Sequence, residues 1–367
     1  MIGAGVVGLA CAERLAREGR AVLVVERNAK HGQETSSRNS QVVHAGMYYP
    51  TGSLKAELCV RGNASLGAWC ETHDVPLSRV GKLIVASDEA GEAELANILA
   101  RARANHVAAL DWATRAEIDA EPNVRARAAL WSPRTGIVDV HALMDSLLAE
   151  ARAKGADVAF QHALVRVERA GDRWSLAVRD ASGEESTFEA PRVVNAAGLW
   201  ADAVAALAGV DLDAAGYRQH FVKGNYFRLH KRGVVSRLVY PVPPKNLAGL
   251  GVHVTVELDG AARFGPDVEP VERPETWAAP DYRVDESRRA AFFRAARGYL
   301  DGFAEDDLAP DQSGVRPKLS RAGEPARDFV IAEESARGMP GWVNLVGIES
   351  PGMTCALEIA ARVATLL

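Results

Sequence analysis

The sequence predicts an α/β protein in which a discontinuous domain surrounds a parallel sheet and an inserted α+β domain surrounds an antiparallel sheet. Three observations predict this fold class. A glycine-rich turn at 3–8 precedes a helical pattern and a buried strand, helical and strand patterns alternate up to residue 198, and the segment 216–267 is rich in strands. The patterns at 329–367 return to the first kind of element, so we expect the first domain to be interrupted.

Composition excludes several classes of protein. The chain has 367 residues with 43 Lys and Arg against 48 Asp and Glu, and its formal net charge of −5 argues against a strongly basic nucleic-acid binder. Its 48% hydrophobic and 25% charged residues are typical of a globular chain rather than a disordered or fibrous one. At about 150 residues per domain, the length suggests two domains.

The distribution of apolar residues and cysteines suggests a location. No stretch approaches the roughly 18 consecutive apolar residues of a membrane span, and the apolar run at 2–12 lacks a basic leader, so we do not expect a signal peptide. The four cysteines form no C-x-x-C pair and no zinc-type spacing with histidine. We therefore expect a reducing compartment, the cytoplasm, and no structural metal.

The first thirty residues match a dinucleotide-binding βαβ unit. Gly3 makes a tight turn, Gly5 lets backbone N–H groups approach a pyrophosphate, and Gly8 permits close packing of the following helix. Glu26 ends the next strand, where its carboxylate can accept hydrogen bonds from the hydroxyls of an adenosine ribose. The alternative is an ordinary glycine-rich turn, but the helix, strand and terminal acid together favour a Rossmann-like domain.

The strand before the glycine turn contains only Met1 and Ile2, whereas strands usually have about five residues. We expect either a stub or a strand whose start is missing from this sequence. Either arrangement would weaken the edge of the adenosine pocket.

The remaining elements follow in chain order. Helical patterns occupy 90–104, 114–120 and 139–155, strands at 163–168 and 174–178 predict a small β-meander with a polar turn at 180–185, and a further strand pattern lies within 190–198. The strand-rich segment 216–267 precedes a charged helical stretch at 285–300, strands at 329–332 and 342–347, and a helix from Pro351.

Several islands of sequence resemble a known family. They are TSSRNSQVVHAGMYYP at 35–50, HFVKGNY at 220–226, YPVP at 240–243, GLGVHVT at 249–255, LDG at 258–260, FGPD at 264–267, GVRPKL at 314–319 and GIESPGMT at 347–354. In this order, after the glycine turn, they resemble the FAD-dependent oxidoreductases of the D-amino-acid oxidase superfamily. Within it, the chain is most similar to the L-2-hydroxyglutarate dehydrogenases and oxidases.

The resemblance implies FAD as the cofactor, although Glu26 alone would suit the adenosine of NAD equally well. It implies a Rossmann-like FAD-binding domain at 1–80, 135–215 and 310–367, and an inserted antiparallel-sheet α+β substrate domain at 81–134 and 216–309. The expected cofactor-binding residues are Gly3, Gly5, Val7, Gly8, Glu26, Arg27, Ser36, Ser37, Asn39, Ser40, His44, Val165, Ala197, Gly198, Gly314, Ser350, Pro351, Gly352, Met353 and Thr354.

Oxidation of a 2-hydroxy acid needs an acceptor for the hydride from Cα, a base for the hydroxyl proton and cations for the carboxylates. The flavin supplies the acceptor. His253 is a candidate base because an imidazole titrates near neutral pH, and the alternative is a buried histidine bonded to a backbone carbonyl. His44 lies where the resembling family brings its chain against the flavin ring, so it could orient the substrate, act as the base or only pack.

Arg316 is expected to grip a carboxylate with two parallel hydrogen bonds, the alternative being an arginine held in a surface ion pair. Lys223, Tyr226 and Tyr240 could meet the second carboxylate of a five-carbon diacid. Strand alternation places Lys223 and Tyr226 on opposite faces, so we do not expect both to do so. Tyr48 and Tyr49 are interpreted as packing residues, and Trp200 as a core residue.

Ser350 and Pro351 are expected to begin the last helix, as N-cap and first-turn residue. Its predicted apolar stripe is Leu357, Ala360, Val363 and Leu366 or Leu367. In the resembling family this helix N-terminus faces the pyrimidine edge of the flavin, where its N–H groups stabilise the negative charge of the reduced ring. The alternative is a plain capped helix.

The resemblance implies oxidation of L-2-hydroxyglutarate, or a similar 2-hydroxy diacid, to the 2-oxo acid, with hydride passing to flavin N5 and electrons then passing to a quinone or oxygen. One alternative is an amino-acid or glycerol-3-phosphate oxidoreductase of the same superfamily, and another is a non-catalytic flavin-binding protein. We expect small-molecule partners and no nucleic acid. A peripheral contact with the inner membrane would give a cytoplasmic enzyme access to quinone.

Overall fold

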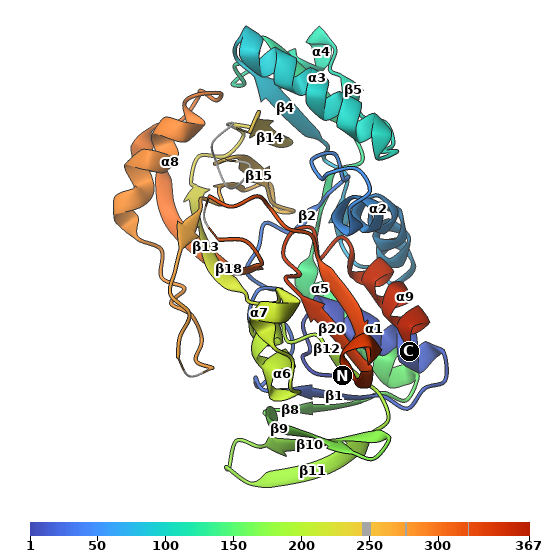
Figure 1. The fold of residues 1–367 in the computed structure, drawn as a ribbon. Helices are drawn as coiled ribbons and strands as arrows, with labels where there is room; N and C mark the ends of the chain where they lie inside the picture. The colour runs from blue at the N-terminus through green and yellow to red at the C-terminus, as the bar shows by residue number, and fades with distance from the viewer. Residues whose placement is uncertain (244–250, 276, 322) are drawn as a thin grey trace.

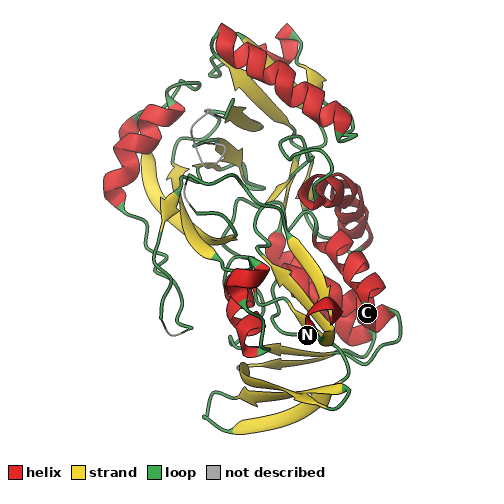
Figure 2. Cartoon of the chain, viewed as in Figure 1, coloured by secondary structure: helices red, strands yellow, loops and turns green. Residues whose placement is uncertain are grey.

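The computed structural model describes residues 1–243, 251–275, 277–321 and 323–367, and two large sheets organise them (Figure 1). Gly249 and Leu250 of the GLGVHVT island lie outside the described residues. The parallel core of one sheet and the largely antiparallel pairing of the other confirm the predicted α/β fold class. Helices and strands are coloured separately in Figure 2.

The first sheet has the strand order β8, β1, Ile2, β12, β20, β19. Its strands are β1 (Leu23–Glu26), β8 (Asp157–Phe160), β12 (Val193–Asn195), β19 (Val330–Glu334) and β20 (Met339–Val346). Ile2 makes parallel bridges to Val25 and to Asn195, so this one residue joins the two halves of the sheet. All neighbours are parallel except the edge strand β19. The short first strand is thus a single bridging position.

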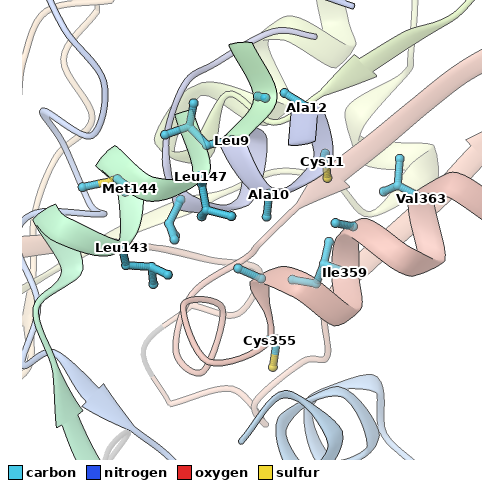
Figure 3. Packing of buried hydrophobic residues seen from close by; sticks show 14 of the residues in the cluster. Leu9, Ala10, Cys11, Ala12, Leu143, Met144, Leu147, Cys355, Ile359 and Val363 are labelled. Carbon is cyan, nitrogen blue, oxygen red and sulfur yellow. The ribbon is translucent and has the colours of Figure 1, made fainter. Parts of the chain in front are cut away.

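Three helices cover one face of this sheet and pack against each other. They are α1 (Val6–Arg17), α5 (Val140–Ala153) and α9 (Ala356–Leu366), and α2 (Leu54–Thr72) packs on α9. Figure 3 shows Leu9, Ala10 and Cys11 of α1 between Leu147 of α5 and Ile359 of α9. Small residues on α1 let both neighbours approach closely, and each fully buried leucine or isoleucine contributes about 2 kcal/mol. This packing fixes the glycine turn that precedes α1.

The other face of the first sheet carries the predicted meander and a short helix. The meander is β9 (Ala163–Ala170), β10 (Arg173–Arg179) and β11 (Glu185–Ala190), all antiparallel, and η1 (Gly198–Trp200), α6 (Ala201–Leu207) and α7 (Leu212–Ala215) follow β12. Ile2, Trp174 and Val204 share one apolar cluster, which joins these elements to the sheet. The first sheet is therefore the middle layer of three.

The second sheet has nine strands in the order β17, β13, β16, β15, β14, β4, β6, β5, with β18 also paired to β13. Its strands are β4 (Lys82–Ala86), β5 (Asp111–Trp112), β6 (Ala128–Ser132), β13 (His220–Leu229), β14 (Leu238–Pro241), β15 (Val254–Val256), β16 (Ala262–Phe264), β17 (Glu269–Pro270) and β18 (Leu308–Lys318). Because β18 belongs to it, this sheet extends past the boundary predicted at 309/310. The division into two domains stays a prediction.

The remaining elements surround the second sheet. They are β2 (Val42–Val43), β3 (Leu77–Ser78) and β7 (Gly136–Val138), which form a small sheet, with α3 (Glu89–Ala104), α4 (Arg115–Asp119), η2 (Glu286–Arg288), α8 (Arg289–Ala296), η3 (Glu305–Asp307) and η4 (Ser335–Arg337). The predicted charged helix at 285–300 is thus shorter than expected, since α8 ends at Ala296. Among the described residues, none of the helices has the length and apolarity that crossing a bilayer demands.

The predicted start of the last helix is wrong. α9 begins at Ala356, and Ser350 and Pro351 lie in a preceding run of turns rather than at its N-cap. The Thr354 hydroxyl accepts a hydrogen bond from the His44 N–H and lies near the Val42 carbonyl oxygen, so the turns are held against β2 instead of continuing the helix. The buried stripe of α9 includes Ala356, Ile359, Ala360, Val363 and Ala364, whereas Leu357 is only partly buried.

Candidate active site

A large cavity, of about 830 Å³, is lined by residues of both sheets and by the loops between them. A smaller cavity of about 110 Å³ adjoins it, since both are lined by Gly5, Ser36 and Gly198. We call these the main cavity and the adenosine-side cavity. Together they place the glycine turn, the 35–44 segment and the 348–354 turn around one site.

The structure brings most of the predicted cofactor residues to these two cavities. The main cavity is lined by Gly5, Val7, Gly8, Ser36, Asn39, Ser40, His44, Gly198, Gly314, Ser350, Pro351, Gly352, Met353 and Thr354, and the adenosine-side cavity by Gly3, Glu26, Arg27 and Ala197. Ser37 and Val165 are the exceptions. The Ser37 hydroxyl donates to the Gly32 carbonyl oxygen, and alternation along β9 gives the adenosine-side cavity Leu164 instead of Val165.

The glycine turn leaves donors free at the cavity wall. Gly3 has a φ of 97°, in the region that favours glycine, and a Cβ on Gly8 would lie 2.1 Å from the Gly3 carbonyl oxygen. Among the described residues, the N–H groups of Val7 and Gly8 at the start of α1 have no hydrogen-bond partner. Free N–H groups at a helix N-terminus bind phosphate oxygens.

Glu26 lines the adenosine-side cavity from the end of β1. It is 8% exposed, and its carboxylate accepts hydrogen bonds from the N–H groups of Ala4 and Asn28, both at 2.8 Å. Burial raises the pKa of Glu26. Trp200, buried as expected, also lines this cavity and stacks on Trp277 with ring centroids 5.7 Å apart. Each carboxylate oxygen keeps a lone pair for a ribose hydroxyl.

The 35–44 segment is shaped by Asn39. Its side-chain NH₂ donates to the carbonyl oxygens of Thr35 and Ser36, and its side-chain oxygen accepts from the Gln41 N–H. The loop therefore crosses the cavity in a fixed conformation, with Ser36 accepting a hydrogen bond from the Val6 N–H at 3.0 Å. Asn39 thus shapes the cavity wall by organising the backbone.

The 348–354 turn presents two further free donors. Among the described residues, the N–H groups of Met353 and Thr354 have no hydrogen-bond partner, and both residues line the main cavity. Although α9 starts later than predicted, these free N–H groups could do what was expected of the helix N-terminus, because unpaired backbone N–H groups stabilise negative charge without reorganising.

His253 lies between the cavity and the second sheet. Its Nδ1 is 3.0 Å from the Gly251 carbonyl oxygen, and its ring stacks on Tyr240 with centroids 3.7 Å apart. Because a carbonyl oxygen only accepts hydrogen bonds, Nδ1 carries the proton and Nε2 carries a lone pair. Burial, together with the positive charges of Lys82 and Arg316, lowers the pKa of His253 to about 3, so the ring is neutral at physiological pH. The hydrogen bond from His253 to a backbone carbonyl oxygen, which was the alternative to a catalytic role, is therefore compatible with a role as base, because it leaves Nε2 free.

His44 directly follows β2 and also lines the main cavity. Its Nε2 is 3.3 Å from the Ser350 hydroxyl, and its backbone carbonyl oxygen accepts a hydrogen bond from Asn63. Burial and the charge of Lys82 lower the pKa of His44 to about 3. Two neutral histidines thus line one cavity.

Arg316 is held by backbone carbonyl oxygens, in contrast to the surface ion pair of the alternative interpretation. Its Nη2 donates to the Asp267 carbonyl oxygen at 2.7 Å and to the Lys223 carbonyl oxygen at 3.3 Å. Among the described residues, no carboxylate pairs with this guanidinium, and Arg316 lines the main cavity. Its charge is therefore available to an anionic ligand.

The structure does not bring Lys223 to the site. Alternation along β13 turns Val222, Gly224 and Tyr226 to the main cavity, and the Lys223 ammonium donates to the Arg283 carbonyl oxygen instead. Of the predicted catalytic residues, the cavity lining therefore includes His253, His44, Arg316 and Tyr240 but not Lys223.

Sequence reasoning missed Lys82, and it assigned Tyr48 and Tyr49 to packing although both line the main cavity. Lys82 begins β4, whose residues are all buried, and its ammonium lies 4.7 Å from the ring centroid of Tyr48 and 4.5 Å from that of Tyr240. The available signal was a lysine at the start of the apolar run Lys82–Ala86, since lysine is almost never fully buried without a partner.

Comparison with known proteins decides the family. The family model described as FAD dependent oxidoreductase, DAO, matches residues 1–366. The chain belongs to this family. This DAO-family oxidoreductase uses FAD, and the predicted superfamily is confirmed.

Relatives and solved structures agree with this assignment. The oxidoreductase is 39% identical to a protein from Arabidopsis thaliana named L-2-hydroxyglutarate dehydrogenase, mitochondrial, over 99% of this chain and 82% of that protein. It is 28% identical to an L-2-hydroxyglutarate dehydrogenase from Salmonella houtenae, over 99% and 91%. Its fold is similar to FAD-bound L-α-glycerophosphate oxidase from Mycoplasma pneumoniae, at a TM-score of 0.85 and 23% identity, covering 100% of this chain and 93% of that one.

The residues of the oxidoreductase fit FAD. The free N–H groups of Val7 and Gly8 suit its pyrophosphate, and the Glu26 carboxylate suits its adenosine ribose. At the other end of the site, the free N–H groups of Met353 and Thr354 suit the oxygen-bearing edge of the flavin ring. Each group of donors or acceptors matches the charge of the part that it would hold.

Replacement of Gly8 by Ala is expected to abolish tight FAD binding. The new Cβ would lie 2.1 Å from the Gly3 carbonyl oxygen, so the turn must open, at a cost of about 3 kcal/mol. Bound flavin per protein, measured by absorbance, should fall to near zero while the circular dichroism spectrum is retained. Gly19→Ala, just past the end of α1, is the control: its φ of 80° strains an Ala there by about 1 kcal/mol, but nothing lies within 4 Å of the added Cβ and the residue lines neither cavity. Retention of flavin by Gly8→Ala would contradict the role of the turn.

Proposed function

We propose that this protein oxidises L-2-hydroxyglutarate, or a closely similar 2-hydroxy acid, to the corresponding 2-oxo acid. Relatives named L-2-hydroxyglutarate dehydrogenase, including one with 39% identity, support the substrate. The observation that carries the proposal is the presence in one cavity of a neutral histidine with a free ring nitrogen, His253, and a guanidinium without a carboxylate partner, Arg316.

These residues meet the chemical needs of the reaction. When bound, FAD would supply the acceptor for the hydride from Cα. Nε2 of His253 accepts the hydroxyl proton while the C–H bond breaks and the carbonyl forms. Arg316 donates hydrogen bonds to the carboxylate next to the hydroxyl group, which fixes the orientation of Cα. The substrate carboxylate also brings negative charge near His253, which raises the pKa of the ring toward that of an effective base.

An anaerobic titration tests this function. Addition of L-2-hydroxyglutarate to the purified flavoprotein should bleach the visible absorbance of the flavin, and the D-enantiomer should leave it unchanged, because the carboxylate, the hydroxyl group and the Cα hydrogen are held by three separate partners. Bleaching by an amino acid or by glycerol 3-phosphate, without bleaching by L-2-hydroxyglutarate, would show the proposed substrate to be wrong. A preparation that stays colourless in excess FAD would support a non-catalytic protein.

The electron acceptor and the location belong to the same proposal. We propose that the reduced enzyme passes electrons to a quinone or to oxygen, and that it works in the cytoplasm with peripheral contact at the inner membrane. Stopped-flow reoxidation by oxygen and by a water-soluble quinone distinguishes the acceptors by rate. Recovery of all the protein in the supernatant after detergent-free extraction would count against the membrane contact.

A further inference from the structure

Lys82 is a buried cation on the face of the second sheet that carries Tyr240. β4 and β14 are parallel, with Lys82 opposite Leu238 and Ile84 opposite Tyr240, so alternation places all four side chains on one face. Lys82 is 1% exposed. Its ammonium stands against the rings of Tyr48 and Tyr240, two residues that line the main cavity.

The part of the chain that the structure describes offers the Lys82 ammonium two aromatic rings but no carboxylate. Among the described residues, no carboxylate forms an ion pair with it, and the titratable groups that act on it or feel its charge are Cys59, His44 and His253. Burial lowers the pKa of Lys82 to about 7, with a small opposing effect of Cys59. A buried, unpaired ammonium is costly, so a fold that retains one does so at a net loss of stability unless a ligand pairs with it.

Two further donors near this ammonium are also unpaired. The hydroxyl groups of Tyr48 and Tyr240 are buried without a hydrogen-bond partner among the described residues, and the Thr255 hydroxyl lies near that of Tyr240. Burial raises the pKa of both phenols, so both remain donors at neutral pH. The two hydroxyl groups belong to residues that line the main cavity, and the ammonium, whose residue is not among the lining residues, lies against their rings. One ammonium and two hydroxyl groups without an acceptor are together the complement of a carboxylate.

The position of His253 relates this cluster to Arg316. The positive charges of Lys82 and of Arg316 both act on the ring of His253, so the base has two cations near it. A 2-hydroxy acid with one carboxylate beside its hydroxyl group and a second carboxylate at the end of its chain carries one anion for each of these two cations.

We propose that Lys82, with the hydroxyl groups of Tyr48 and Tyr240, binds the distal carboxylate of a dicarboxylic 2-hydroxy acid, while Arg316 binds the carboxylate next to the hydroxyl group. This inference rests on the proposed function and deepens it, because it makes Lys82 the residue that selects a diacid over a monoacid. Lys223, to which sequence reasoning gave this role, faces away from the cavity.

The test compares two substrates that differ only at the far end. L-2-Hydroxyglutarate carries a distal carboxylate, and L-2-hydroxyvalerate carries a methyl group there on a chain of the same length. Lys82→Met keeps the length of the side chain and removes its charge. It should raise KM for L-2-hydroxyglutarate by about 100-fold, with kcat/KM for L-2-hydroxyvalerate within about threefold of the parent value. Tyr48→Phe should lower the diacid preference by about fivefold to tenfold.

One further readout does not depend on turnover, and another uses pH. Glutarate, which has no hydroxyl group, should perturb the flavin absorbance of the parent enzyme on binding, and its Kd should rise by about 100-fold in Lys82→Met. In the parent enzyme, the preference for the diacid should fall as pH rises through about 7, since the free ammonium loses its proton there, and the preference of Lys82→Met should stay flat. The melting temperature and bound flavin of each variant establish that it is folded.

The outcomes separate this inference from the proposed function. If the parent enzyme is reduced by neither hydroxy acid, the proposed function is wrong and this inference is wrong with it. If Lys82→Met oxidises L-2-hydroxyglutarate with an unchanged KM, or loses activity toward both substrates equally, the distal site is wrong and the proposed function stands. If Lys82→Met loses its flavin, Lys82→Gln replaces it in the same comparison of substrates. In the parent enzyme, a Kd for glutarate that does not rise as pH increases through about 7 would then contradict the distal site.

Discussion

Replacement of His253 by Asn is expected to slow flavin reduction by L-2-hydroxyglutarate by about 10²- to 10⁴-fold. Asn keeps a side-chain N–H that can donate to the Gly251 carbonyl oxygen, but it has no ring nitrogen to take the hydroxyl proton. Hydride leaves Cα readily only as the hydroxyl proton is removed, so loss of the base slows the chemical step itself. Anaerobic stopped-flow absorbance at saturating substrate measures this step directly, and the substrate Kd should change little.

Two other histidines supply the comparison. His141→Asn, on the exposed face of α5, controls for loss of a histidine remote from the cavities. His44→Asn tests the second histidine of the main cavity, whose Nε2 lies near the Ser350 hydroxyl. If His44→Asn shows the large decrease and His253→Asn does not, then His44 is the base and His253 only supports Tyr240.

The environment of His253 also predicts an unusual pH dependence. A base acts in its neutral form, which predominates above its pKa, and the pKa of His253 in the free enzyme is lowered to about 3 by burial. The acid limb of kcat/KM should therefore lie well below the range near 6.5 that is expected of an exposed histidine. A decrease between pH 7.5 and 5.5 that disappears in His253→Asn would mean that the ring is solvated, contrary to its burial.

Local sequence patterns predict those parts of the fold that are determined by interactions between residues close together in the chain. The glycine turn, α1 and β1 follow from residues within one βαβ unit, because glycine conformation and helical periodicity act over a few residues. The helices α3 and α5 begin next to the expected positions for the same reason, since Asp88 and Asp139 cap them with their own side chains.

The start of α9 shows where a local rule fails. Ser350 followed by Pro351 is typical of a helix N-terminus, and nothing in the neighbouring sequence contradicts it. The turn is held instead by Thr354, which contacts β2 more than 300 residues earlier in the chain. That hydrogen bond exists only in the folded chain, so no window of sequence around Ser350 contains it.

Lys82 was missed for a related reason. Its importance comes from the pairing of β4 with β14, which brings Tyr240 onto the same face of the sheet, and from the loop that places Tyr48 over it. Strand order in a mixed sheet depends on long-range contacts, so a lysine that begins an apolar run does not reveal its neighbours. By contrast, alternation within β13 is local, and it correctly separated Lys223 from Tyr226.

Replacement of Arg316 by Met is expected to lower kcat/KM for L-2-hydroxyglutarate by about 10²- to 10³-fold. The guanidinium is held at Nη2 by the carbonyl oxygens of Lys223 and Asp267 and at Nε by that of Val222, which fixes its plane and leaves Nη1 for the substrate carboxylate. Loss of this contact removes the orientation of Cα as well as binding energy, so kcat should fall and KM should rise. Steady-state kinetics with L-2-hydroxyglutarate and with L-2-hydroxyvalerate should show the same loss, because both substrates keep the carboxylate that Arg316 binds.

Arg316→Lys should restore little of this loss, since an ammonium keeps the charge but not the planar fork that donates two parallel hydrogen bonds. Arg283→Met is the matched control, because the Arg283 side chain is 90% exposed and pairs only with the neighbouring Asp281. If Arg316→Met lowers kcat/KM for the diacid and leaves kcat/KM for the monoacid unchanged, then Arg316 binds the distal carboxylate and Lys82 the carboxylate next to the hydroxyl group. The pair of substrates therefore determines which end of the molecule each cation holds, because only the distal end differs between them.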